Sequence, residues 1–287
     1  IVAGLVGASA SLAAFAAFDE LWLWFIARYL LGFSTSIIFT VSEAWLNTAC
    51  PDRLRGRVSG IYGASMCAGF AAGPLAIPFV GSVLLALFGH RREAAAINST
   101  CSLLTFLASV LLATRIVAEG PTRAFDQQFF VDPLNVFLIA LTALVGFTTS
   151  LFSRPYMRVE HHHGRLSVGR LRLYHSMFQM FMCTMLIALS TNNLGILWVA
   201  MEAATLTTVL LVALYRTPAS LEAAWKYFIL CGVGIAQALF GTILIYMAAR
   251  PVIGEGHDAM VWTTLVAHAA AFSPELLNVA FVFLMLG

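Results

Sequence analysis

A succession of long apolar segments restricts the fold of this chain more than any other feature. A membrane-spanning helix needs about 20 mostly apolar residues. Of the 287 residues, 60% are hydrophobic and 10% are charged, whereas about 25% are charged in an average soluble domain. This composition excludes a soluble enzyme, a nucleic-acid-binding protein and a disordered tail, and it predicts an integral, multi-pass membrane protein. The apolar segments are residues 1–18, 21–46, 58–89, 94–117, 133–153, 174–190, 193–213, 222–249 and a last one from about 276.

These segments are expected to be helices, because they lack the alternation of a transmembrane strand and each must satisfy its own backbone hydrogen bonds. The prediction is an all-α, polytopic bundle of about 8–10 membrane helices. It is expected to be truncated at both ends, since the chain begins inside one apolar run and stops inside another. Residues 250–275 are broken by prolines and charges, and their apolar part, 259–272, is too short to span. That stretch is predicted to be interfacial or re-entrant.

Arginine accounts for 15 of the 16 basic residues, and its placement indicates the orientation. The connector 154–173 holds five arginines, and alternate crossings put 90–93 and 215–221 on the same side. Only Arg115, Arg123 and Arg250 fall on the opposite side. We therefore expect the arginine-rich side to face the cytoplasm.

One connector contradicts this alternation. Residues 47–57 are also basic, yet a single apolar run, 58–89, separates them from the basic turn 90–93. Two crossings need about 40 residues, and one crossing leaves a basic flank outside. One interpretation is a long, tilted helix that violates the charge rule. The interpretation we favour is a fusion of two unrelated membrane-protein fragments, with one domain at 1–75 and the other at 76–287.

Two stretches within residues 20–75 resemble the Major Facilitator Superfamily, in the region of its fourth and fifth helices. They are RYLLGFSTSIIFTVSEAWLN, from Arg28, and RLRGRVSGIYGASMCAGFAAGPL, from Arg53. Since only a few of that family's helices are matched, this segment is not expected to transport a solute alone. The residues that match transporter motifs are Arg28, Glu43, the basic turn of Arg55, Gly56 and Arg57, and the pair Gly73 and Pro74.

Residues from about 76 to 287 resemble a different family. Its members are the antiporter-like membrane subunits of NADH:quinone oxidoreductase, Mrp antiporters and group 4 hydrogenases, above all hydrogenase-4 component F. The matching strings are IPFVGSVLLALFGHRREAAAIN (77–98), FVDPLNVFLIALTALVGFTTSLFS (130–153), NLGILWVAMEAATLTTVLLVALYRTPASLEAAWKYFILCGVGIA (193–236) and AFVFLMLG (280–287).

This second resemblance implies a proton-translocating subunit with no redox cofactor of its own, in a prokaryotic inner or plasma membrane. The implied partners are the other membrane and redox subunits of a hydrogenase or NADH dehydrogenase type complex, with protons or sodium as the transported ion. Residues 193–213 would be the fifth helix and 222–249 the sixth. An ion-translocating subunit of this kind contributes no catalytic residues itself.

Glu202 is the strongest candidate for a proton relay. It lies near the middle of the run 193–213, with no base nearby in sequence. An ionised carboxylate at the bilayer centre costs about 2.5–3.5 kcal/mol, so the group must pair with a cation or be protonated. A carboxyl group in that position can exchange a proton when a neighbouring cation moves. The alternative is a static, buried acid in a helix–helix hydrogen bond. The resemblance assigns Glu202 to the family's channel glutamate.

Lys226, the only lysine, is the second candidate. It lies near the start of the run 222–249, four residues after Glu222. It could extend to the lipid headgroups or form an i, i+4 ion pair, whereas the resemblance favours a relay role. His175 and His268 are weaker relay candidates. The tract of three histidines at 161–163 is predicted to be a solvated connector.

No motif of a soluble enzyme or of a metal site occurs. Five cysteines lie far apart without C-x-x-C spacing, so no metal site and no cofactor are expected. Two other functions remain open. The chain could act as a secondary transporter of the major facilitator type, with a small solute bound at the midplane. It could also be a chimeric fragment without activity.

Overall fold

The computed structural model describes residues 73–91 and 93–287, together with scattered positions between 6 and 41. The chain divides into two compact units, Ile1–Met66 and Cys67–Gly287. In the first unit the described positions are helical, and the Ser11 hydroxyl donates to the Gly7 carbonyl at 2.7 Å. The transporter-motif residues Arg28, Glu43, Arg55, Gly56 and Arg57 lie outside the described residues.

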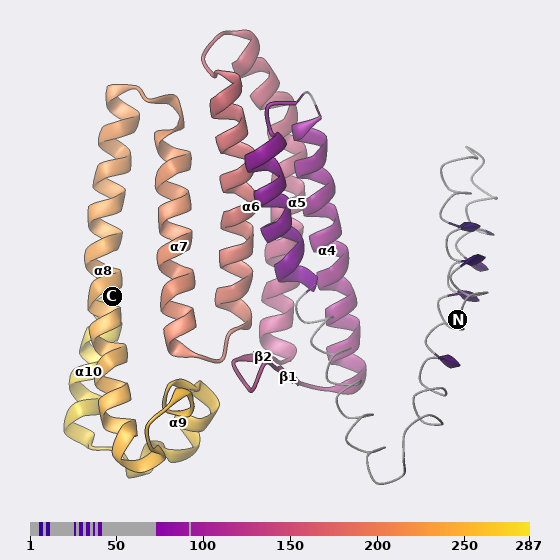
Figure 1. Cartoon of the computed structure of the whole chain (residues 1–287). Helices are drawn as coiled ribbons and strands as arrows, with labels where there is room; N and C mark the ends of the chain where they lie inside the picture. Colours follow the sequence, from indigo (N-terminus) through magenta and orange to yellow (C-terminus); the bar gives the residue numbers. More distant parts are fainter. Residues whose placement is uncertain are drawn as a thin grey trace. The chain divides into compact units, whose positions relative to one another are not determined.

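The second unit is a bundle of helices (Figure 1). Its long helices are α4 (Ala94–Glu119), α5 (Pro133–His162), α6 (Val168–Ser190), α7 (Leu194–Val212) and α8 (Pro218–Ile253). A helix at Gly73–Phe88 precedes them, and α9 (Trp262–His268) and α10 (Pro274–Leu286) follow. The smaller elements are the 3-10 turns η1 (Ala213–Tyr215), η2 (His257–Met260) and η3 (Ala269–Ala271) and the strands β1 (Thr122–Ala124) and β2 (Phe129–Val131).

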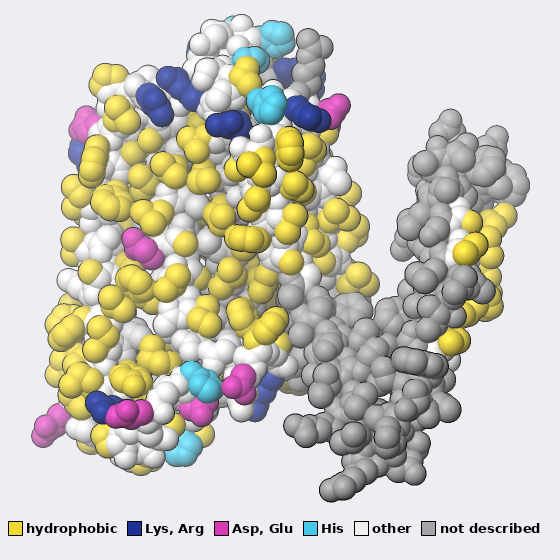
Figure 2. All heavy atoms as spheres, in the orientation of Figure 1, with side chains coloured by type: hydrophobic (Ala, Val, Ile, Leu, Met, Phe, Trp, Pro, Cys, Tyr) yellow, Lys and Arg dark blue, Asp and Glu magenta, His cyan; other side chains and the backbone are white. Residues whose placement is uncertain are grey.

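Five helices in the described part of the chain are long and apolar enough to cross a membrane: α4, α5, α6, α8 and α7 extended to Tyr215. The helices Gly73–Phe88 and Pro274–Leu286 are apolar but shorter. Large hydrophobic side chains cover the outside, as the apolar band of Figure 2 shows. The prediction of an all-α, polytopic membrane bundle is confirmed.

Polar side chains fix where several helices begin. The Asp132 carboxylate accepts from the backbone N–H groups of Leu134 and Asn135, and Asn135 bonds back to the Asp132 N–H, which makes a capping box at the start of α5. The side chains of Ser167, Asn193 and Thr217 cap α6, α7 and α8 by accepting from backbone N–H groups of the first turn.

Residues 154–173 are mostly helical, so the prediction of a connector over the whole stretch is wrong. Helix α5 continues to His162 through Pro155, and α6 already begins at Val168. Hydropathy indicates which residues can lie in the hydrocarbon layer of a membrane. It does not show where the helix itself ends, because backbone hydrogen bonds can continue into polar residues. The two helices therefore extend beyond the apolar layer and carry arginines on their ends. The run 58–89 is likewise described as a helix only over Gly73–Phe88, with Pro78 inside it.

Residues 118–132, which separate the apolar runs 94–117 and 133–153, contain a β-hairpin. Strands β1 and β2 pair antiparallel, with Thr122 opposite Val131. Three non-glycine residues of its turn, Phe125, Asp126 and Gln127, have positive φ. Such residues are uncommon there, and they gave the sequence reading no hairpin signal.

Candidate functional site

The arginine-bearing turns lie at one end of the second unit. The turn with Arg91, the α5–α6 turn and the α7–α8 turn with Arg216 are drawn together at the top of Figure 1, opposite the hairpin and α9. Figure 2 shows the basic side chains gathered along that end. This agrees with the alternate counting from the sequence, which put these connectors on one side.

Glu202 lies near the middle of α7, as the ninth of 19 residues. It is half-buried. Within the described residues its carboxylate forms no ion pair or hydrogen bond. The flanking residues are small or apolar, and Thr205 bonds back to the Met201 carbonyl at 3.1 Å. A carboxylate at this depth is thus available to a cation or a proton donor that approaches α7.

Lys226 lies in the third turn of α8, which packs against α7. Its ammonium group donates to the Glu222 carboxylate at 2.5 Å, and the side chains are 70% and 66% exposed. The structure does not pair Lys226 with Glu202. Counted from the α7–α8 turn, Lys226 lies roughly five residues closer to the turn, or about 8 Å along the helix axes.

His175 occupies a different place, on α6 near the arginine-rich end. It is 4% exposed and stacks edge-on against Tyr174, with ring centroids 5.2 Å apart. Its Nδ1 atom is buried without a hydrogen-bond partner among the described residues. His268 lies far along the chain in α9, where it is exposed and its Nδ1 contacts the Thr264 carbonyl at 2.9 Å. The four relay candidates therefore do not form one cluster.

Gly73 and Pro74, predicted to be a transporter motif, are the first two described residues of the helix Gly73–Phe88. Pro74 is fully buried, and the Cys183 thiol of α6 contacts the next residue's carbonyl, Leu75 O, at 3.5 Å. Both motif residues belong to the second compact unit. They lie directly before Leu75, whose carbonyl contacts α6.

The sequence reading missed a buried polar cluster between α4 and α6. The Gln179 side-chain amide is fully buried, and its two N–H groups are shared among three acceptors: the Asn98 carbonyl at 3.0 Å, Asn98 Oδ1 at 2.8 Å and Ser102 Oγ at 2.8 Å. Its own Oε1 lacks a partner within the described structure. Neighbouring Ser176 donates to the Ser82 carbonyl at 3.0 Å. The sequence contained a sign of this cluster, because Asn98 and Gln179 are strongly polar residues within long apolar segments.

A second polar cluster connects the elements at the end of the bundle opposite to the arginine-bearing turns. Asn192 donates to the Gln127 carbonyl at 3.0 Å and to Thr263 Oγ1 at 2.9 Å, which links the hairpin, the α6–α7 turn and α9. Asn193 donates to Gln128 Oε1 at 2.7 Å. Throughout the described residues, no three His, Cys, Asp or Glu side chains are grouped so that they could hold a metal ion.

The fold and its charges define the class: a polytopic, helical membrane protein. The family model of the Major Facilitator Superfamily matches residues 1–274, and the chain belongs to that superfamily. An uncharacterised MFS-type transporter of Bacillus subtilis is 34% identical over 70 residues, which are 24% of this chain and 18% of that protein.

Most of the chain is also homologous to membrane subunits of respiratory complexes. The hydrogenase-4 component F homolog of Methylacidiphilum infernorum is 48% identical over 217 residues, 76% of this chain and 44% of that protein. NADH-quinone oxidoreductase subunit N of Granulibacter bethesdensis is 29% identical over 221 residues, 76% of this chain and 43% of the subunit. The chain thus spans less than half the length of these relatives.

A solved structure has the same fold. A chain of the archaeal membrane-bound sulfane sulfur reductase, a respiratory membrane complex, superposes with a TM-score of 0.63 at 19% identity. The match covers 75% of this chain and 43% of that chain. Over three quarters of its length, the chain therefore shares the helical fold of that protein.

Proposed function

We propose that residues 76–287 act as the N-terminal portion of a proton-translocating membrane subunit, in a complex of the hydrogenase or NADH-quinone oxidoreductase type. Electron transfer in partner subunits would drive the protons, and this chain would hold no redox cofactor. The homology to component F and subunit N supports the assignment.

The observation that carries the proposal is the position of Glu202. A half-buried carboxylate midway along a spanning helix, without an ion-pair partner in the described structure, is expensive to keep ionised in a bilayer. A cation that approached α7 would stabilise the charged carboxylate. Repeated approach and withdrawal of that cation would make Glu202 release and take up a proton.

We also assign Lys226 to the relay, but in this role its side chain would have to change its partner. It faces Glu222 and must leave that pair to approach α7. An exposed i, i+4 pair is worth about 0.3–0.5 kcal/mol, so the exchange is inexpensive. His175 and His268 would serve at the two ends of the bundle, where each lies.

The test replaces Glu202 by Gln in the complete subunit, assembled with its partners. Glutamine keeps the size of the side chain but cannot alternate between charged and neutral forms. We expect proton pumping into vesicles to fall at least tenfold, while the amount of assembled complex stays constant. Glu202→Asp retains the charge about one methylene short and should keep part of the activity.

Glu222→Gln is the matched control, because it also removes one carboxylate but lies exposed at the end of α8. Its pumping should stay within about twofold of the parent. If Glu202→Gln pumps at the parental rate in normally assembled complex, Glu202 is a structural residue and the relay is wrong.

We also propose that the arginine-rich end faces the cytoplasm of a prokaryotic cell, because basic connectors are retained there. Ser167 at that end and Ser273 at the other are both exposed and each can be made a single cysteine. An impermeant thiol reagent added to intact cells should label Ser273→Cys and spare Ser167→Cys. The reverse pattern would invert the orientation.

A solute transporter is the second candidate, favoured by the superfamily match over 1–274. Against it, we propose that the chain joins two fragments near residues 67–76. The shares matched by the two kinds of relative, 76% and 24% of the chain, support that division. Residues 67–287 expressed alone should then unfold at the same temperature as in the whole chain. A large loss of stability would favour one continuous transporter fold.

A further inference from the structure

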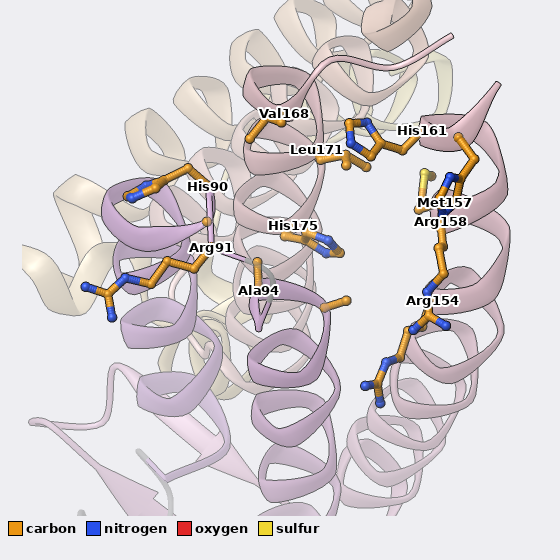
Figure 3. A pocket seen from close by; sticks show the side chains of 13 residues that line it. His90, Arg91, Ala94, Arg154, Met157, Arg158, His161, Val168, Leu171 and His175 are labelled. Carbon is orange, nitrogen blue, oxygen red and sulfur yellow. The ribbon is translucent and has the colours of Figure 1, made fainter. Parts of the chain in front are cut away.

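A pocket opens at the arginine-rich end of the second unit, between the turn 89–91, α4, α5 and α6. Its volume is about 670 Å³, within the range of about 300–1,000 Å³ that is typical of ligand sites. Figure 3 shows α5 on one side of the space and the start of α4 on the other, with His175 between them. The lining residues are Gly89, His90, Arg91, Ala94, Ala95, Arg154, Met157, Arg158, His161, His162, Val168, Leu171 and His175.

The lining is basic. Three arginines and four histidines contribute to it, and no aspartate or glutamate does so among the described residues. The side chains of His90 and Arg91 extend away from the space in Figure 3, and Arg91 lies over the Phe88 ring at 5.4 Å. Arg154 and Arg158 are therefore the arginines that could contact a ligand in the pocket. They stand about one turn apart on the wall formed by α5.

The nearby acids do not neutralise these arginines. Glu160 is buried and bonds to Arg165 at 3.0 Å, and Glu93 does not line the pocket. Within the described structure Arg154 and Arg158 form no ion pair or hydrogen bond. Two like charges on one wall repel each other, so an anion placed between them would be favoured.

The inner wall holds a second, independent sign of a ligand. His175 is 4% exposed, and its ring projects into the pocket in Figure 3 with Nδ1 lacking a partner in the described part of the chain. A buried polar nitrogen without a hydrogen bond costs about 1–3 kcal/mol. An oxygen acceptor in the pocket would satisfy it. Met157 and Leu171 give the same space an apolar surface.

We propose that this pocket binds a phosphate group, and that the phosphate belongs to the headgroup of an anionic lipid. Arg154 and Arg158 would donate charge-assisted hydrogen bonds to the phosphate oxygens, and the His175 imidazole would donate a third from the inner wall. In a bilayer the pocket would lie where the spanning helices emerge among the headgroups, so a lipid would reach it with its chains along the apolar surface of α5. Basic pockets between membrane helices bind anionic headgroups in this way. The proposal does not depend on a relay at Glu202.

The test uses the whole chain, purified in a neutral detergent and stripped of lipid. Three probes are titrated: short-chain phosphatidylglycerol, inorganic phosphate, and a short-chain diacylglycerol that lacks the phosphate. Native mass spectrometry counts the bound molecules, and thermal unfolding measures the stabilisation. We expect phosphatidylglycerol to bind at one site and to raise the unfolding temperature, while diacylglycerol does not.

The variants locate the site. Arg154→Gln with Arg158→Gln should weaken phosphatidylglycerol binding by about a hundredfold, since each arginine contributes about tenfold. His175→Leu, which keeps the volume but removes the donor, should weaken it by about tenfold. Arg216→Gln is the matched control, because it removes one exposed charge at the same end outside the pocket. Its binding should stay within twofold.

The outcomes separate the sources of the phosphate. Binding of phosphatidylglycerol that inorganic phosphate at millimolar concentration does not displace supports a lipid site. Tight binding of inorganic phosphate with the same loss in Arg154→Gln/Arg158→Gln keeps the phosphate site but overturns the lipid. If no phosphate probe binds, or if Arg216→Gln loses as much as the double variant, the pocket is not a phosphate site.

Discussion

Helices α6 and α8 differ in how far the rest of the unit covers them. In the most apolar window of α6, 56% of the residues are buried, against 17% in α8. Buried polar side chains lie on α6, among them His175, Ser176 and Gln179, and neighbouring helices supply partners for Ser176 and the Gln179 amide. The exposed face of α8 carries Ile229, Leu230 and Val233 instead.

The comparison shows what keeps each helix in place. Lipid is as apolar as the outside of α8, so apolar side chains there supply no drive for association. Packing of small residues and interhelical hydrogen bonds must supply it. Helix α6 uses hydrogen bonds, and α8 uses a close approach to α10 at Gly241.

The largest effect is expected at Gln179. Gln179→Ala removes an amide whose two N–H groups serve three acceptors, leaves Asn98 and Ser102 without that donor and creates a cavity. The free energy of unfolding should fall by about 2–3 kcal/mol. The matched variant is Gln237→Ala in α8, a half-buried glutamine, which should change stability by less than about 0.5 kcal/mol. Unfolding in mild detergent, followed by circular dichroism, measures both. Equal losses of stability in the two variants would show that α6 does not depend on buried hydrogen bonds more than α8 does.

A smaller effect is expected from glycines of α8. A Cβ at Gly241 would lie 3.0 Å from the Ala280 carbonyl oxygen and 3.1 Å from the Leu284 nitrogen of α10. Backbone atoms cannot turn aside as a flexible side chain can, so in Gly241→Ala the whole of α10 has to move away. This should destabilise the unit by about 1–2 kcal/mol. At Gly232 nothing lies within 4 Å, so Gly232→Ala should stabilise by up to about 1 kcal/mol. Shifts of the same sign at both positions would contradict this account of α8.

The capped ends of the bundle give the next comparison. Asn193→Ala removes the cap of α7 and the contact to Gln128 in the hairpin. Thr217→Ala removes only the cap of α8. We expect losses of about 1–2 and about 0.5–1 kcal/mol, respectively. Hydrogen exchange should show faster opening of the hairpin in Asn193→Ala alone. Protection of residues 122–131 at the parental level would mean that the hairpin does not depend on this contact.

Much of this architecture follows from the sequence, because burial in lipid leaves a chain few choices. Apolar length predicted α4 to α8, and arginine placement predicted which turns share an end. The hairpin was not predictable in this way, since it depends on hydrogen bonds from Asn192 and Asn193, which are distant in sequence. The helical extension of α5 past Arg154 was hidden for another reason, because hydropathy does not register a helix outside the hydrocarbon.

The candidate site was predictable in composition and not in geometry. Glu202 and Lys226 stand out in any apolar sequence, and the spacing of Glu222 and Lys226 allowed an ion pair, but the sequence did not decide between that pair, a headgroup contact and a relay partner for Lys226; the structure forms the pair. The pocket lined by Arg154, Arg158 and His175 escaped sequence reading, because its residues come from segments far apart along the chain.

Replacing Lys226 of α8 is expected to have the smallest effect on the free energy of unfolding. The same replacement tests whether Lys226 has a functional role. Lys226 and Glu222 form an exposed pair, with side chains 70% and 66% accessible. Removing one exposed partner changes the free energy of unfolding by about 0.3–0.5 kcal/mol. Lys226→Gln should therefore leave the unfolding temperature nearly unchanged, as should Glu222→Gln. The two variants should differ in the vesicle assay. If Lys226 leaves its partner to meet Glu202, Lys226→Gln lowers proton pumping while Glu222→Gln does not, because the glutamate only holds the lysine at rest. If both variants pump like the parent, the pair is a headgroup contact and the relay must draw its cation from another helix. Lys226→Arg keeps the charge, so its rate should lie between those of the parent and Lys226→Gln.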